Sequence, residues 1–103
     1  MPNRNYQAGR DLEWAVAKQR RTLYGADTAR SAGSHGKWDL TVVWPLGTVE
    51  LIQCKLVATQ AEADRLKKRW KEEPPLGHRK EARYHQVLVV KMKGKSEWEE
   101  VCV

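Results

Sequence analysis

The chain has 103 residues, a formal net charge of +6 at pH 7 and a sequence pI near 9.6. This length allows one domain with one modest hydrophobic core and excludes a second core, so residues 1–103 are expected to form a single domain. The basic balance favours a polyanionic partner, and no apolar run approaches the ~20 residues of a membrane span.

Cysteine usage and the N-terminal residues predict the compartment. Cys54 and Cys102 lie in apolar, strand-like segments and lack the close spacing of a metal-binding pair, so both are interpreted as free buried thiols. The N-terminus lacks the apolar core of a secretion signal. We therefore expect a cytoplasmic protein of a prokaryote, or a viral protein in the host cytoplasm.

The first predicted element is a helix over about residues 6–21, with one apolar stripe facing a core. The residues assigned to this stripe are Leu12, Ala15, Val16 and Leu23. Glu13 lies at the edge of the stripe, where an acid is often solvated or paired with a neighbour such as Arg10. Arg20 and Arg21 suit the dipole at the helix end and require no functional explanation.

A short strand within residues 24–32 and a polar loop over 30–37 precede a predicted hairpin. The hairpin opens at Asp39, turns at residues 45–48, and returns through Gln53 and Lys55, which share one face of the strand. Folding through this turn places Asp39 within about one residue of opposite Gln53. A carboxylate, an amide oxygen and an ammonium then converge, which suits a hard metal ion beside a nucleophilic water.

The second half of the chain predicts a helix over 59–72 and strands over 84–92 and 98–103. Ala63, Leu66 and Trp70 share one face of this helix, and the two prolines at 74–75 end it. The apolar run 87–90 is typical of a central strand covered on both faces. The predicted fold class is α/β, with a central mixed β-sheet flanked by both helices.

Positive charge is concentrated in residues 65–83, which carry eight basic residues and three acids, or +5 of the net +6. Such a run is often simply a solvated helix face. Beside a candidate metal site it favours phosphate contacts.

Several motifs together are more specific than any one of them. They are Tyr6-x-x-Gly9-x-x-x-Glu13, then Arg30-Ser-Ala-Gly-Ser-His-Gly, then Asp39, then Gln53-Cys54-Lys55. This set resembles the archaeal-type Holliday junction resolvases, a branch of the PD-(D/E)XK nuclease superfamily. The resemblance covers residues 6–57, and beyond it rests on the order of elements. It implies a single-domain PD-(D/E)XK nuclease-like fold.

The resemblance also implies a catalytic site. Glu13 matches the family's helix-borne acid, Asp39 its metal-binding aspartate and Lys55 its motif lysine. Mg²⁺, for which Mn²⁺ is expected to substitute, would be held by Asp39, the Gln53 side-chain oxygen and the Cys54 backbone carbonyl. Glu13 would bind it directly or through water, and Lys55 would orient and help deprotonate the attacking water.

DNA contacts are implied in two places. The loop after the first strand would hold the backbone near the scissile bond through Arg30, Ser34, His35 and Lys37. His35 is alternatively a simple surface residue. The basic helix and the loop after it would contact the DNA arms through Lys67, Lys68, Lys71, Arg79 and Lys80.

Two departures from the family pattern leave the substrate class open. Trp38 replaces proline at a position without direct chemistry, and Gln53 replaces glutamate, which removes one charge from the metal site. Relatives of the Mrr type also carry Gln-x-Lys.

The resulting expectation is a Holliday junction resolvase that acts as a homodimer, because two symmetric cuts need two sites. The alternatives are an Mrr-like nuclease acting on duplex or modified DNA and a non-catalytic DNA-binding module. No organic cofactor is expected.

Overall fold

The computed structural model describes residues 4–30, 38–78 and 84–103. Its elements follow the predicted order and confirm the α/β class. They are α1 (Arg4–Tyr24), β1 (Asp27–Arg30), β2 (Leu40–Val43), β3 (Val49–Val57), α2 (Gln60–Glu72), β4 (Tyr84–Met92) and β5 (Trp98–Cys102). Among these residues no helix is sufficiently long and apolar to cross a membrane.

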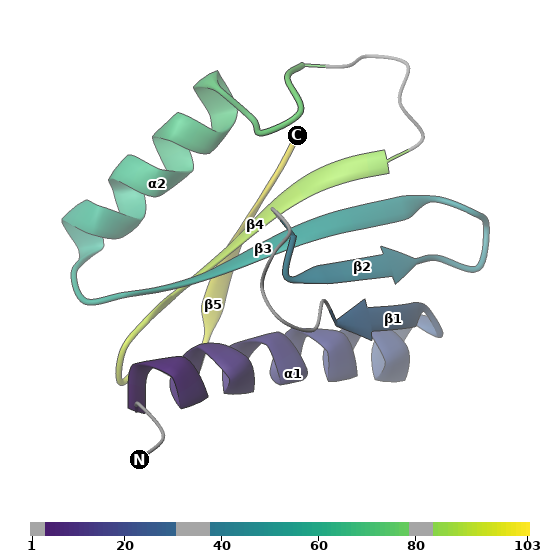
Figure 1. The fold of residues 1–103 in the computed structure, drawn as a ribbon, viewed down its shortest axis with the longest axis horizontal. Coiled ribbons are helices and arrows are strands. Elements are labelled where there is room, and N and C mark those ends of the chain that lie inside the picture. The colour runs from purple at the N-terminus through teal and green to yellow at the C-terminus, as the bar shows by residue number, and fades with distance from the viewer. Residues whose placement is uncertain (1–3, 31–37, 79–83) are drawn as a thin grey trace.

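The strands form one mixed sheet in the order β1-β2-β3-β4-β5. β3 and β4 are parallel, whereas each of the other neighbouring pairs is antiparallel. A parallel pair requires a crossover connection, and α2 supplies it (Figure 1). The predicted mixed sheet is therefore confirmed.

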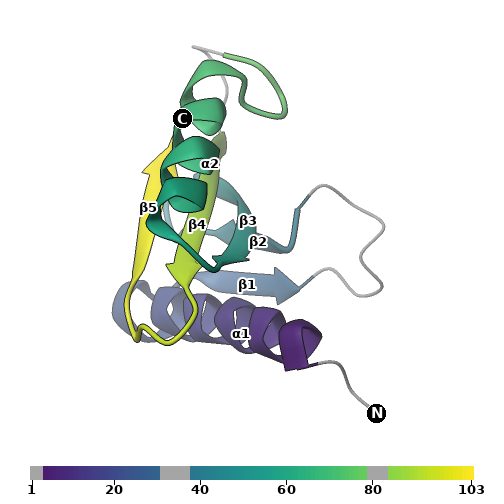
Figure 2. The same cartoon turned by 90° about the vertical axis from the view of Figure 1, so that its left-hand side faces the viewer.

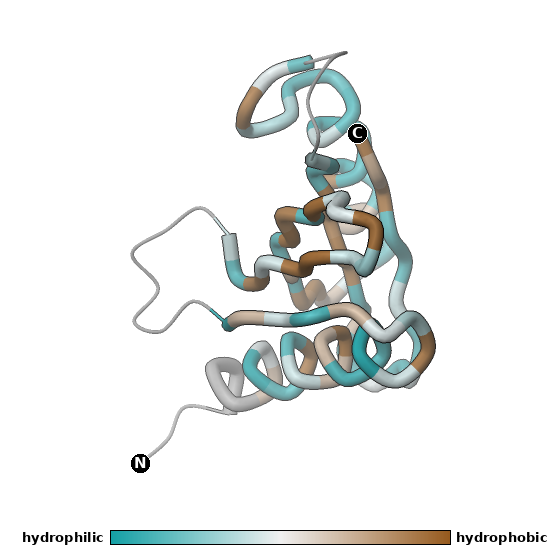
Figure 3. Tube along the Cα trace, turned by 90° about the vertical axis from the view of Figure 1, so that its right-hand side faces the viewer, coloured by the Kyte–Doolittle hydropathy of each residue, from teal (hydrophilic) through white to brown (hydrophobic). Residues whose placement is uncertain are grey.

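The two helices cover opposite faces of the sheet (Figure 2). On the α1 face, Leu12 and Val16 pack with strand residues such as Ile52. On the α2 face, Ala63 and Trp70 pack with their own set of strand residues. Figure 3 shows the apolar residues concentrated in the strands, with the outer turns of both helices hydrophilic. The sheet thus separates two half-cores.

The central strand β4 contributes to both half-cores, as predicted. Val87 and Val89 belong to the α1 side, whereas Leu88 and Val90 belong to the α2 side. All four are at least 97% buried. A strand enclosed in this way needs an unbroken apolar run, which is what the sequence provides.

The predicted apolar stripe of α1 is wrong at two positions. Ala15 is exposed, and Leu23 in the last turn is 65% exposed. The buried face instead runs through Leu12, Val16 and Arg20 at steps of four residues. The face of α1 that packs on the sheet is therefore centred on Val16 and includes the charged Arg20, which the pattern of apolar residues does not reveal.

The prediction of two buried thiols is also wrong for one cysteine. Cys54 is half-buried against the α1-side core, whereas Cys102 is exposed on the edge strand β5. Alternation along an edge strand directs every second side chain outward, whatever its polarity.

Candidate functional site

The candidate site lies where β3 extends beyond its neighbour β2. β2 begins at Leu40, which pairs with Ile52, whereas β3 continues to Val57 and so extends beyond this end of β2 (Figure 1). The Asp39 amide donates to the Ile52 carbonyl at 2.9 Å, and the register places Asp39 opposite Gln53. The predicted register of the hairpin is confirmed.

One hydrogen bond joins Asp39 to the Gln53-Cys54-Lys55 motif. The Cys54 amide donates to Asp39 Oδ2 at 2.8 Å, which fixes the carboxylate beside the middle residue of that motif. Burial raises the pKa of the Cys54 thiol, and the negative charges of Asp39 and Glu13 raise this pKa further. The thiol therefore stays neutral, and the backbone of Cys54 is the part that serves the site.

Glu13 meets the same site from α1. Arg30 Nη2 of β1 lies 3.7 Å from Glu13 Oε2, and both side chains are mostly buried. Burial raises the pKa of Glu13, and the charge of Asp39 raises it further, although Arg30 and Arg10 act in the opposite direction. The two carboxylates are thus close enough to repel each other, and the expected pairing with Arg10 is only a minor influence.

Arg30 is incompletely satisfied. Its guanidinium lies 5.6 Å from the centroid of the Trp14 ring, an arrangement typical of a cation–π contact. Its Nε is buried and has no hydrogen-bond partner within residues 4–30, 38–78 and 84–103. A buried donor of this kind favours an additional acceptor, such as an oxygen of a bound anion.

Gln53 and Lys55 lie on the face of β3 opposite to α1 and Glu13. Ile52 packs on the α1 side and Val57 on the α2 side, so alternation directs Gln53 and Lys55 toward the α2 face. Gln53 is half-buried and Lys55 is exposed. The structure therefore divides the predicted catalytic residues between the two faces of one sheet edge.

Asp39 occupies the point where these faces meet. The preceding Trp38 packs against the α2-side core, where its ring lies 5.9 Å from that of Trp70 in an edge-to-face arrangement. The following Leu40 is buried in the α1-side core. Asp39 is thus held by apolar neighbours anchored on both sides, and this accounts for a bulky residue where the resembled family has proline.

The residues at this edge fit a hard divalent cation. Within the described part of the chain no three His, Cys, Asp or Glu side chains are grouped as a metal site. Glu13 and Asp39 nevertheless supply carboxylates and the Cys54 carbonyl supplies a neutral oxygen, the donor types that Mg²⁺ and Ca²⁺ prefer, whereas the Gln53 amide lies on the α2 face of β3. Burial and, to a smaller extent, the charge of Asp39 raise the pKa of Glu13, and a bound cation would favour its ionised form.

The predicted DNA-contacting residues are placed unequally. Lys68 and Lys71 are exposed on α2, as are Arg65 and Arg69. Lys67 instead forms ion pairs with Glu99, at hydrogen-bonding distance, and with Asp64, 3.4 Å away. These contacts raise the pKa of Lys67. Lys67 is therefore the least available of the three predicted lysines on α2. Other predicted contacts lie outside the described residues, namely Ser34, His35, Lys37, Arg79 and Lys80.

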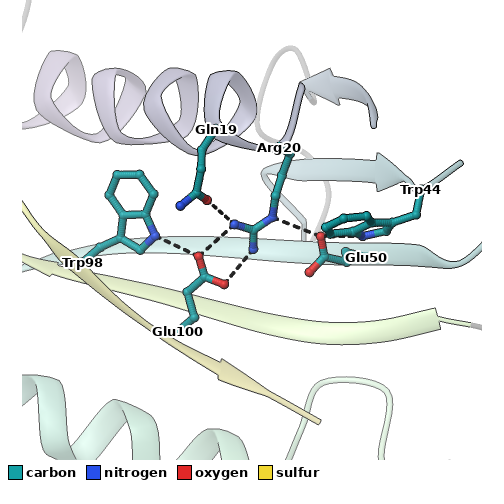
Figure 4. Close-up of polar contacts among 6 residues, drawn as sticks. All are labelled: Gln19, Arg20, Trp44, Glu50, Trp98 and Glu100. Carbon is teal, nitrogen blue, oxygen red and sulfur yellow. Dashed lines mark hydrogen bonds and ion pairs between the residues drawn. The ribbon is translucent and has the colours of Figure 1, made fainter. Parts of the chain in front are cut away.

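A second charged cluster was missed from the sequence (Figure 4). Arg20 is 4% exposed; its Nε lies 3.1 Å from Glu50 and its Nη2 lies 2.7 Å from Glu100. The indoles of Trp44 and Trp98 donate to Glu50 and Glu100, each at 2.8 Å. Burial disfavours the charged form of Arg20, but the hydrogen bonds that Arg20 donates to both carboxylates outweigh burial and raise its pKa.

The explanation of Arg20 by the helix dipole alone is therefore wrong. The available signal was its spacing of four and eight residues from Val16 and Leu12, which continues the buried stripe of α1.

Comparison of the chain with protein-family models, with curated proteins and with solved structures found no match.

Proposed function

We propose that this protein is a Mg²⁺-dependent endodeoxyribonuclease that resolves four-way DNA junctions, and that its domain is a PD-(D/E)XK nuclease-like fold. One observation carries the proposal: the Cys54 amide binds Asp39 Oδ2, which links the aspartate of the first hairpin strand to the Gln-x-Lys motif of the second. Glu13 and Arg30 complete the site from α1 and β1. The proposed site draws on residues that are up to 42 positions apart in the sequence.

The catalytic roles follow from the donors at this edge. Asp39, Gln53 and the Cys54 carbonyl would hold the metal, with Glu13 beside them. When bound, the metal supplies Lewis-acid stabilisation of the phosphoryl oxygens and lowers the pKa of a coordinated water.

Lys55 performs the remaining proton chemistry. Exposed at the same sheet edge, its ammonium orients the attacking water and offsets the negative charge that develops on the phosphate. Arg30 binds a phosphate oxygen through the donor that lacks a partner among the described residues.

Recognition of the DNA arms is assigned to α2. Its exposed basic residues contact phosphates, so the protein recognises branch shape and backbone rather than sequence. One chain provides one candidate site, and a two-fold homodimer supplies the second cut. Such an activity belongs to DNA recombination and repair.

A cleavage assay tests this function. A synthetic four-way junction and a duplex of the same sequence are incubated with Mg²⁺, with Mn²⁺ and with EDTA. We expect paired cuts near the branch point in either metal and no cleavage in EDTA. Equal cleavage of the duplex would identify an Mrr-like nuclease, for which the neutral Gln53 is the motivating feature. Junction binding without cleavage in either metal would identify a non-catalytic module.

A further inference from the structure

Trp14 is the tryptophan of this chain that the fold uses least. Trp38 and Trp70 pack against each other, and the indoles of Trp44 and Trp98 bind buried or half-buried carboxylates. Trp14 is instead 47% exposed, directly after Glu13 on α1. Its position is therefore unexplained by the core and close to the candidate site.

The contact with Arg30 fixes this ring relative to the carboxylates. The guanidinium lies 5.6 Å from the centroid of the Trp14 ring and also reaches Glu13 at 3.7 Å. The guanidinium thus links the indole to the Glu13 carboxylate. A ring held in this way is an ordered flat surface beside the site, rather than a freely rotating side chain.

Flat aromatic and guanidinium surfaces beside a phosphate-binding group suit one class of ligand. We propose that Trp14 and Arg30 form a binding site for an unpaired nucleobase next to the phosphate that is cut. An indole stacks on any base, whereas bases within a continuous duplex are stacked on each other and unavailable. This inference rests on the proposed function and narrows its substrate class to DNA with an unpaired base at the cleavage point.

Binding measurements in EDTA test the stacking site without cleavage. Three probes are compared: a four-way junction with two unpaired thymidines at the branch point, the same junction with two abasic nucleotides there, and an uninterrupted duplex. Trp14→Ala should weaken binding of the thymidine junction by about 5- to 150-fold, the range for losing one base–aromatic stack. It should change affinity for the other two probes by less than about 2-fold, because they offer no base to stack.

Two further variants serve as controls. Trp14→Tyr keeps an aromatic face and should retain most of the affinity for the thymidine junction. Leu23→Ala removes another exposed apolar side chain from the same helix and should change nothing. Circular dichroism of each variant verifies that α1 is intact.

Equal losses on all three probes, or no loss on any, would overturn the stacking site. If sedimentation shows that Trp14→Ala dissociates a dimer and the losses are equal, the ring belongs to a protein interface instead. Cleavage in Mg²⁺ is measured separately. A parent protein that cuts none of the probes refutes the proposed nuclease. The ratio of parent to Trp14→Ala affinity on each probe still shows whether Trp14 binds an unpaired base.

Discussion

Two charged clusters lie under the same helix, α1, and they differ in how completely their charged groups are paired. The first, named the buried cluster after its buried Arg20, consists of Arg20, Glu50 and Glu100. The second, named the open cluster because Arg30 Nε lacks a partner among the described residues, consists of Glu13, Arg30 and Asp39. In the buried cluster each ion pair is 3.1 Å or shorter, and the carboxylates receive additional indole donors. In the open cluster the ion pair is 3.7 Å long and Arg30 Nε is unpartnered among the described residues.

The pKa shifts have opposite directions in the two clusters. Burial would raise the pKa of Glu100, but its hydrogen bonds to Arg20 and Trp98 outweigh burial and lower it. Burial and the charge of Asp39 raise the pKa of Glu13 despite the nearby Arg30. Folding therefore favours the ionised form of one glutamate and disfavours that of the other. The groups of the first cluster satisfy one another, whereas Arg30 Nε of the second lacks a partner among the described residues.

The largest expected effect concerns the proposed catalysis, through Asp39 of the open cluster and Lys55 of β3. Asp39→Asn and Lys55→Ala should each lower the cleavage rate roughly 10²- to 10⁴-fold, because each removes a group that acts in the transition state. Neither residue belongs to the basic surface of α2, so junction affinity should remain within a few-fold of the parent.

A gel-shift titration beside a cleavage time course measures both quantities. Parent-like cutting by either variant, with the metal requirement intact, would place the active site elsewhere.

The next effect concerns the stability of the buried cluster. Arg20→Ala leaves Glu50 and Glu100 without their buried cation and should reduce the free energy of unfolding by about 3–5 kcal/mol. Lys18→Ala, on the exposed side of the same helix, should change it by less than about 0.5 kcal/mol. Urea denaturation followed by circular dichroism gives both values. A loss below about 1 kcal/mol for Arg20→Ala would show that the cluster contributes little stability.

A matched pair of smaller effects has opposite signs. Because folding raises the pKa of Glu13, its ionised form destabilises the folded state at neutral pH, and Glu13→Gln should increase stability there. The increase should fade as the pH falls toward the ordinary glutamate pKa. Because folding lowers the pKa of Glu100, Glu100→Gln should reduce stability at neutral pH, and this reduction should fade as the pH falls through the lowered pKa.

Urea midpoints at pH 7 and pH 4 for both variants give this sign test. Stability changes of the same sign for Glu13→Gln and Glu100→Gln at pH 7 would contradict the distinction between the two clusters.

The smallest effect concerns the exposed lysines of α2. Lys68→Ala and Lys71→Ala should each reduce the slope of log affinity against log salt by up to ~0.9 on duplex arms. Lys67→Ala should reduce this slope less, because Lys67 already forms ion pairs with Glu99 and Asp64. Affinities across a salt series provide the slopes. Equal slopes for parent and variants would show that α2 faces away from DNA.

The sequence predicts the strands and the hairpin register well because these depend on local signals. Alternation defines the faces of β3, and the turn around Gly47, with φ of 91°, fixes the pairing that places Asp39 opposite Gln53. The apolar pattern does not tell how far a helix extends past the sheet that it covers. Leu23, in the last turn, is therefore wrongly predicted to be buried. Ala15 is wrongly predicted for another reason, since the buried face of α1 runs through Leu12, Val16 and Arg20.

The contacts between elements were not predictable in the same way. Glu13 meets Arg30, and Trp14 meets the same guanidinium, only because α1 packs across β1 at one particular rotation. Arg20 already had a sufficient local explanation at the helix end. Its true partners lie 30 and 80 residues away, beyond any periodicity that a sequence window samples.

The separation of 80 residues between Arg20 and Glu100 has a kinetic consequence. A contact that closes nearly the whole chain into a loop cannot form until β5 has joined the sheet, so we expect it late in folding. Interactions absent from the transition state act mainly on the unfolding rate. The ion pair between the first helix and the last strand should therefore determine how long a folded molecule survives, while the speed of folding is set by the strands between them.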